Sequence, residues 1–112
     1  MDPVEVIMQG CQLTFYTQQN HRHGHQTVAE WLMFEVRRLG IRGATMIAGT
    51  EGIDHVGKLH AARFFELAEQ PIEVVLAITD EEAERLLDVV RAERVHVFYT
   101  RFPIDFEMLG DN

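Results

Sequence analysis

The chain has 112 residues, 46% of them hydrophobic and 25% charged, which is enough for one folded domain with its own core. Its 18 acidic and 10 basic residues give a formal net charge of −8, so the surface repels nucleic acid and anionic lipid, and no nucleic-acid partner is expected. The single cysteine, Cys11, excludes an intrachain disulfide, and no apolar run reaches the ~20 residues of a membrane span. We therefore expect a cytoplasmic protein.

The first predicted element is a strand over residues 11–17. Leu13 and Phe15 fall on one side of it, and Thr14 and Tyr16 fall on the other side. This period of two is typical of a strand with one buried face.

The next predicted element is a helix over residues 27–39. Thr27 and Glu30 have the spacing of a capping box, in which each side chain bonds the backbone of the other residue. Apolar residues follow at helical spacing, and Gly40 is suited to the left-handed conformation that ends many helices.

The second half of the chain contains three more predicted strands and one more helix. The strands cover residues 43–49, 72–79 and 95–100, and a second capping box at Thr79 and Glu82 begins a helix before the last strand. The order is therefore βαββαβ. It predicts a ferredoxin-like α+β fold, in which a four-stranded antiparallel sheet carries two helices on one face.

We expect a single domain over residues 1–112. Residues 1–10 would form an N-terminal extension. Residues 50–70 would form a long functional loop, because loops of this size usually bind a ligand or a partner.

Two of the predicted elements carry more apolar surface than one chain can bury. The strand over 72–79 is apolar on both faces, and Trp31, Leu32, Met33 and Phe34 sweep about three-quarters of a turn of the first helix. Because a ferredoxin-like subunit covers only one face of its sheet, we predict that copies of the chain associate. Scattered exposed apolar side chains are the alternative interpretation.

The segment RGATMIAGTEGI, residues 42–53, makes the sequence similar to a known family. Its Gly-Thr-Glu-Gly element, residues 49–52, is followed by a histidine and by an L-x-x-x-P pattern that leads into an apolar strand. This arrangement resembles an uncharacterised bacterial family, domain of unknown function one-ninety, which is grouped with the PII-like signal proteins. The other residues that carry the resemblance are Leu13 to Tyr16, Gly24, His60 to Arg63 and Pro71.

The resemblance implies a homotrimer that binds a small effector, such as an adenine nucleotide, in clefts between subunits and acts in signal transduction. It also implies that the loop of residues 50–70 reports occupancy to a protein partner, such as a membrane transporter or an enzyme. PII proteins wrap phosphates with a glycine-rich segment before the last strand, but here this segment reads VVRAERVH. Its arginines, Arg91 and Arg94, could still pair with an anion.

The candidate ligand site combines the start of the loop, the loop itself and the last strand. Glycines around a hydroxyl and a carboxylate let backbone groups approach a ligand, although glycines also serve bends at strand ends. The basic loop residues would meet an anionic effector or an acidic partner, or would only be solvated. The candidate residues are Gly49, Thr50, Glu51, Gly52, His55, Lys58, His60, Arg63, Arg91, Arg94 and Arg101.

Three histidines in the HRHGH motif raise the alternative of a divalent-metal site. His21, His23 and His25 alternate, so an extended chain would place them on one side but about 6.5 Å apart in succession. They would need a turn at Gly24 to reach one ion. Loop side chains that change their charge with pH are the other interpretation.

We expect no enzymatic activity. The chain contains no serine, Cys11 has no identifiable base, and the start of a helix explains Glu81 and Glu82. The alternatives are a small-substrate enzyme on a ferredoxin-like oligomer, such as a dimeric monooxygenase, and a metal-tolerance trimer.

Overall fold

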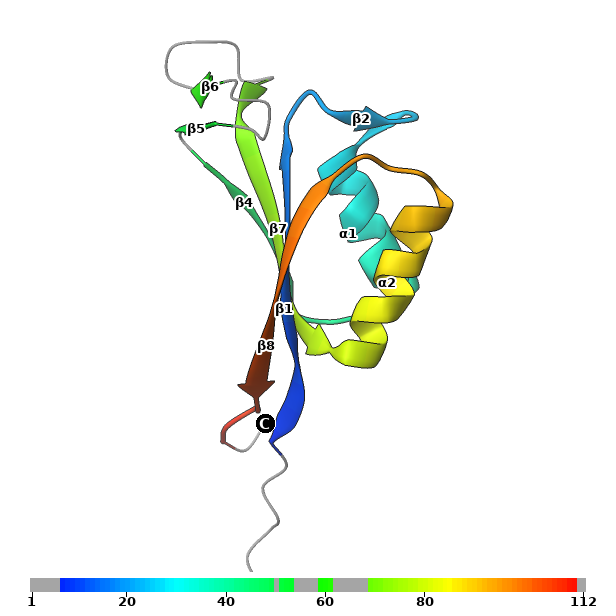
Figure 1. The fold of residues 1–112 in the computed structure, drawn as a ribbon, viewed down its shortest axis with the longest axis vertical. Coiled ribbons are helices and arrows are strands. Elements are labelled where there is room, and N and C mark those ends of the chain that lie inside the picture. The colour runs from blue at the N-terminus through cyan, green and yellow to red at the C-terminus, as the bar shows by residue number, and fades with distance from the viewer. Residues whose placement is uncertain (1–6, 50, 54–58, 62–68, 111–112) are drawn as a thin grey trace, which may run out of the picture.

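The protein is built on a four-stranded antiparallel sheet with the spatial order β4–β7–β1–β8 (Figure 1). The computed structural model describes residues 7–49, 51–53, 59–61 and 69–110, with only the backbone of 51, 52 and 59–61. The main elements are β1 (Met8–Gln18), α1 (Val28–Arg38), β4 (Ala44–Ala48), β7 (Pro71–Thr79), α2 (Asp80–Ala92) and β8 (Phe98–Phe106). Their order confirms the ferredoxin-like α+β fold.

Two short hairpins interrupt this core order. The first consists of β2 (Arg22–His23) and β3 (Gln26–Thr27), and it connects β1 to α1. The second consists of β5 (Glu51–Ile53) and β6 (Leu59–Ala61), and it lies between β4 and β7. Both hairpins lie at the same end of the sheet, which is the upper end in Figure 1.

Both helices begin at the predicted capping boxes. Thr27 accepts a hydrogen bond from the backbone N–H of Glu30 at 3.1 Å, and the Glu30 carboxylate accepts one from the N–H of Thr27 at 3.0 Å. Thr79 and Glu82 repeat this arrangement at the start of α2. These bonds satisfy helix N–H groups that have no partner inside the helix, which is why two short helices start where the sequence predicts. Neither helix of the described chain is long and apolar enough to cross a membrane.

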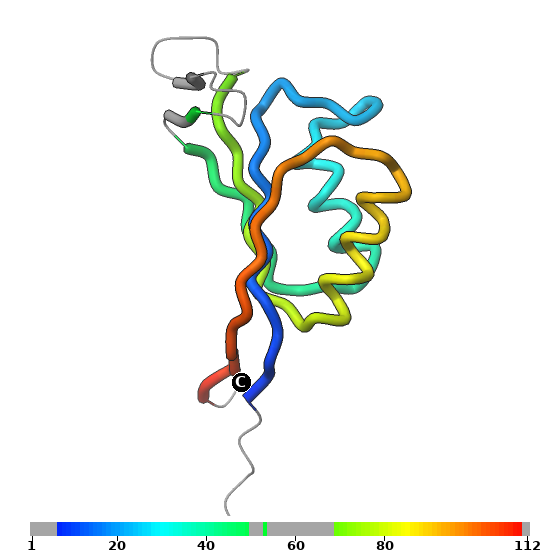
Figure 2. Tube along the Cα trace, viewed as in Figure 1, coloured from blue at the N-terminus to red at the C-terminus, as the bar shows by residue number. Residues whose placement is uncertain are grey.

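The helices cover one face of the sheet and close the core there. Both helices lie on the same side of the strands (Figure 2). The predicted inward residues of β1, Leu13 and Phe15, are fully buried, as are Val74 and Leu76 of β7. Val28, Leu32, Ala83 and Leu86 are the fully buried helix residues that pack onto them.

The first helix has the excess of apolar side chains that the sequence predicts. Trp31 and Leu32 are buried, but Phe34 is 54% exposed. Four successive residues span too wide an arc for one buried stripe, so one of them has to point away from the sheet.

The last strand differs from its predicted extent. The sequence predicts a strand over residues 95–100, whereas β8 begins at Phe98 and continues to Phe106. Arg101 and Pro103 are unusual in a strand, so the sequence pattern does not predict its second half. Phe102, Ile104 and Phe106 nevertheless keep the period of two. A proline is tolerated because β8 is an edge strand of the sheet, where one side of the backbone needs no partner.

Candidate functional site

The described residues leave the sheet face opposite the helices uncovered. The pairing register places Ile47, Glu73, Tyr16 and Phe98 in one row across the four strands of this open face. Val75 lies in the next row, beside Thr14, and is half-buried. The third predicted strand, β7, therefore carries apolar residues on both faces, as its sequence indicates, but its outward face also carries Glu73.

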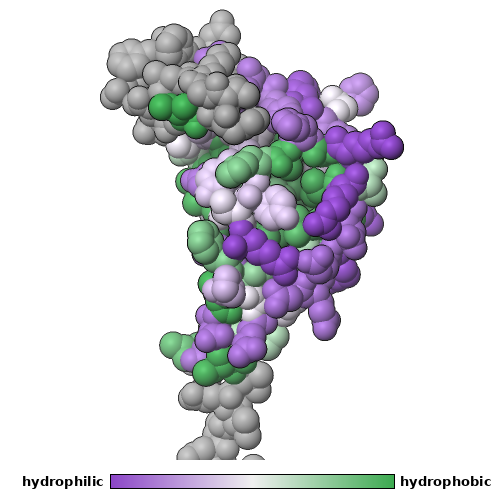
Figure 3. Space-filling view, in the orientation of Figure 1, coloured by the Kyte–Doolittle hydropathy of each residue, from purple (hydrophilic) through white to green (hydrophobic). Residues whose placement is uncertain are grey.

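Aromatic side chains line the β8 side of the open face. The rings of Tyr16 and Phe98 lie 5.6 Å apart, and the Tyr16 hydroxyl lies 3.5 Å from Thr100 Oγ1. Phe98 is 54% exposed and Phe102 is 58% exposed. Apolar surface also appears at the lower end of the molecule, where the described chain carries exposed Ile7, Met8, Met108 and Leu109 (Figure 3).

Gly49, a candidate ligand residue, lies at the base of the long loop. Its N–H donates to the Pro71 carbonyl at 2.8 Å, and its own carbonyl accepts from Gln70 Nε2 at 3.3 Å. The Gln70 carbonyl in turn accepts from the N–H of Gln19 at the end of β1, at 2.9 Å. These bonds hold both chain ends of the segment 50–69 against the end of β1.

A side chain at Gly49 would meet the ring of Pro71 at 3.5 Å, which is ordinary van der Waals contact. Space alone therefore does not require a glycine at this position.

The remaining loop candidates fall on the second hairpin or outside the described residues. Glu51 and Gly52 belong to β5, where they pair with Ala61 and His60 of β6. Thr50, His55, Lys58 and Arg63 lie outside the described residues.

Arg91 and Arg94 flank the turn between α2 and β8. The Arg91 guanidinium bonds the exposed carboxylate of Asp88 at 3.2 Å. Arg94 is exposed, forms no side-chain hydrogen bond or ion pair within the described chain, and has a φ of 55°. This left-handed conformation is the one that glycine usually supplies at a helix end, but here an arginine adopts it.

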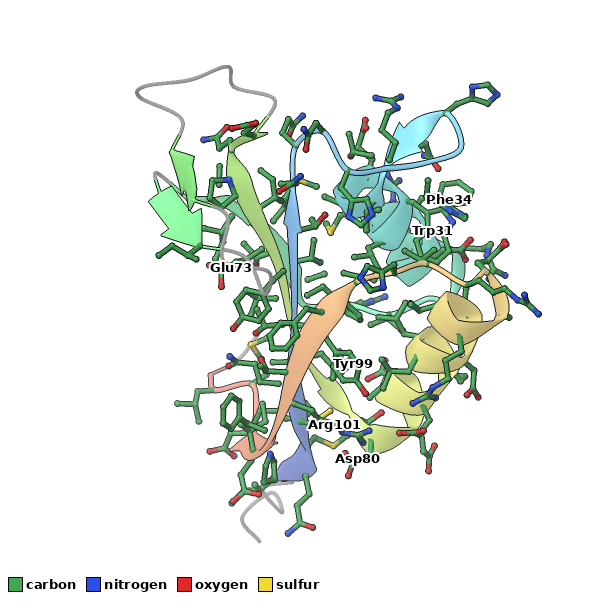
Figure 4. The ribbon with its side chains drawn as sticks, turned by 45° about the horizontal axis from the view of Figure 1, so that its top comes forward. Trp31, Phe34, Glu73, Asp80, Tyr99 and Arg101 are labelled. Carbon is green, nitrogen blue, oxygen red and sulfur yellow. The ribbon has the colours of Figure 1, made fainter. Side chains whose placement is uncertain are left out.

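Arg101 lies inside β8 and not after the last strand, where the sequence pattern places it. Its guanidinium faces the helix layer and bonds Glu84 at 2.5 Å and Asp80 at 2.9 Å, both on α2 (Figure 4). The hydrogen bonds from Glu84 and then Asp80 raise the pKa of Arg101 further above its usual value. The Arg101 guanidinium is therefore already paired with two carboxylates, and these ion pairs join β8 to the first turns of α2.

The three histidines of the HRHGH motif are in three different environments. The His23 ring packs edge-on against Trp31 at a centroid distance of 4.8 Å. His21 Nδ1 lies 3.3 Å from Thr17 Oγ1, whereas exposed His25 uses its backbone carbonyl to accept from Arg22 at 2.6 Å. The chain does turn at Gly24, which has a φ of 65°. Yet no three histidine, cysteine or carboxylate side chains of the described residues gather as metal ligands.

His21 is coupled to His96, a residue that the sequence patterns do not single out. Burial lowers the pKa of His21, and the nearby charge of His96 lowers this pKa further. The two residues are far apart in sequence, so only the approach of the α2–β8 turn to the first hairpin reveals the pair. The sequence patterns also do not single out Glu73, although the alternation of β7 places it on the face of the sheet opposite to that of Val74.

These features define a ferredoxin-like α+β protein with one open sheet face and a long excursion between its second and third core strands. The chain belongs to the DUF190 family, described as an uncharacterized ACR, whose family model matches residues 10–102. The family resemblance seen in the sequence is thereby confirmed. A search of curated proteins found no match.

Two solved structures support the fold assignment. CPII from Thiomonas intermedia K12, a nitrogen regulatory PII-like protein bound to ADP, AMP and bicarbonate, is similar with a TM-score of 0.69, 15% identity and 94% of each chain covered. A protein from Thermus thermophilus, TTHA0516, named as a putative PII-like signaling protein, has a TM-score of 0.62 at 18% identity, and the match covers 90% of this chain and 92% of that one. At such low identity, the likeness carries the fold alone.

Proposed function

We propose that this chain is a PII-like ligand-sensing protein and not an enzyme. Copies associate through the open sheet face as a homotrimer in the cytoplasm and bind an adenine nucleotide in the clefts between them. Residues 50–70 then signal occupancy to a protein partner, such as a transporter or an enzyme. The observation that carries the proposal is the likeness to CPII, which is bound to ADP, AMP and bicarbonate.

The open face supports the assembly step. Tyr16, Ile47, Phe98 and Phe102 are all at least 40% exposed in the single chain. Burying such surface stabilises an interface by ~25 cal/mol per Å² of apolar area before the entropic costs of association.

The turn between α2 and β8 supports the ligand step. Arg94 presents a guanidinium that no described carboxylate neutralises, and guanidinium pairs well with phosphate. The glycine-rich phosphate loop of PII proteins is absent from this turn. Binding here would therefore rely on side-chain charge and not on a cradle of backbone N–H groups.

The hydrogen bonds at Gly49 and Gln70 support the signalling step. They join both ends of the segment 50–69 to each other and to β1. A ligand that contacts this base would change the state of the loop only if it binds one loop arrangement better than another. The metal alternative is not favoured, because the three imidazoles of the HRHGH motif have separate environments.

Calorimetry and thermal unfolding of the full chain test the proposal with ADP, AMP, bicarbonate and Zn²⁺ as separate probes. A nucleotide at about 100 times its Kd should add ~2.7 kcal/mol to the free energy of unfolding. Arg94→Ala should weaken nucleotide binding at least ~10-fold, whereas Arg85→Ala, at an exposed arginine of α2 that bonds only the Leu39 carbonyl, should leave it unchanged. A strong Zn²⁺ response with none to nucleotides would contradict the proposal.

A further inference from the structure

Glu73 is the single charged side chain on the open face among the described residues of the four-stranded sheet. The alternation of β7 directs it away from the buried residues Ile72 and Val74, and Figure 4 shows it on the side opposite the helices. Its neighbours across the strands are Ile47 and Tyr16. The other described strand residues of this face are uncharged: Met8, Gly10, Gln12, Thr14, Gln18, Thr45, Pro71, Val75, Ala77, Thr79, Phe98, Thr100, Phe102, Ile104 and Phe106.

This carboxylate limits the ways in which two open faces can meet. In a two-fold dimer with sheets face to face, each face packs against an identical face. Glu73 would then meet only uncharged side chains or the other Glu73, because the described face holds no cation. A buried carboxylate without a cation is strongly unfavourable, and two facing carboxylates repel each other.

A head-to-tail ring avoids this problem, because a different surface of the neighbour then covers the face. The chain has guanidinium groups outside the sheet that are available for this contact. Within the described chain, Arg37, Arg42 and Arg94 are exposed and take part in none of the ion pairs. The other described arginines already bond a carboxylate or a backbone carbonyl, as Arg38 and Arg101 do with carboxylates.

We propose that Glu73 is an intersubunit anchor: it receives an arginine from the neighbouring copy and thereby favours a closed head-to-tail ring over a face-to-face dimer. This inference deepens the proposed assembly and rests on it. It also assigns the second copy a specific contribution, a guanidinium from a surface other than the sheet.

Sedimentation analysis of the full chain over a range of concentrations tests the inference without any ligand. Glu73→Lys should raise the dissociation constant of the assembly at least ~10-fold, and Glu73→Gln should raise it less. Glu81→Lys makes the same charge change at an exposed residue of α2 and should have little effect. Circular dichroism should show that all three variants remain folded, since none of these side chains lies in the core.

A charge exchange identifies the partner. One of Arg37→Glu, Arg42→Glu and Arg94→Glu should weaken assembly as Glu73→Lys does, and joining it to Glu73→Lys should restore most of the association. If Glu73→Gln tightens the assembly, if Glu73→Lys behaves like Glu81→Lys, or if the unmodified chain remains a single subunit, the inference is overturned. Calorimetry with ADP tests the proposed function separately. If ADP does not bind but the Glu73 variants still weaken the assembly, the nucleotide proposal fails and the role of Glu73 stands.

Discussion

The two faces of the sheet are built from the same strands but end in different environments. On β7, Val74 and Leu76 are fully buried under the helices, whereas the alternate residues Val75 and Ala77 remain half-buried and exposed. The helix face therefore is complete within one chain. Among the described residues, the open face holds aromatic side chains and one carboxylate, Glu73, and the proposed assembly would cover it. The comparison shows that a subunit can close its own core and still carry an unfinished surface.

The largest effect is expected from a truncation on the helix face. Phe15→Ala removes a fully buried ring of β1 and should lower the free energy of unfolding by about 3–5 kcal/mol, because the core cannot close over the cavity. Urea denaturation at a fixed chain concentration measures this. A loss below about 1 kcal/mol would show that the helix face is not the closed core.

A substitution on the open face should act on association instead of folding. Phe102→Gln keeps the strand but removes an exposed ring, so it should raise the dissociation constant of the assembly about 10-fold while changing unfolding by less than ~1 kcal/mol. Light scattering together with denaturation separates the two effects. Equal association by Phe102→Gln and the unmodified chain would remove Phe102 from the interface.

Removal of a helix cap should lower the stability less than the loss of a core ring, because a cap only stabilises the start of one helix. Thr79→Ala leaves the N–H of Glu82 without its side-chain acceptor and should cost about 1 kcal/mol of stability. Glu93→Ala, at the exposed C-terminal end of the same helix, serves as the control. If both variants lose the same stability, the loss does not come from the cap.

The smallest expected effect is a pH dependence at the end of the sheet that carries the first hairpin. The folded-state pKa of His21 is lowered from 6.5, so the unfolded chain binds this proton more readily. Stability should therefore be full above pH 6.5 and should fall as the pH decreases below it, toward the folded pKa. Thermal unfolding at several pH values should show a shallower decline for His21→Gln. The exposed His25→Gln should keep the original slope.

Local patterns in the sequence were enough to predict most of the fold. The alternation of Leu13 and Phe15, and the capping boxes at Thr27 and Thr79, act over a few residues, so the sequence alone exposes them. The end of β8 was predicted less well. Its outer half contains an arginine and a proline, and only pairing with β1 makes that segment a strand.

The candidate site was less predictable, because its contacts join distant residues. Arg101 was chosen as a ligand residue, but its position opposite Asp80 and Glu84 depends on how α2 packs beside β8. The His21–His96 pair and the Gln70 bond to Gly49 also depend on segments brought together by the fold. The roles proposed for Gly49 and Arg94 stay predictions.

The sequence by itself determined the order of helices and strands, the residues that face the core, and the excess of apolar surface on β7 and α1. Periodicity and capping are local, because they depend on ~2.0 or ~3.6 residues per repeat and on hydrogen bonds within one turn. Only the tertiary structure decided which charges are already paired and which remain available. An ion pair depends on the distance between side chains, and that distance is fixed only when the elements pack.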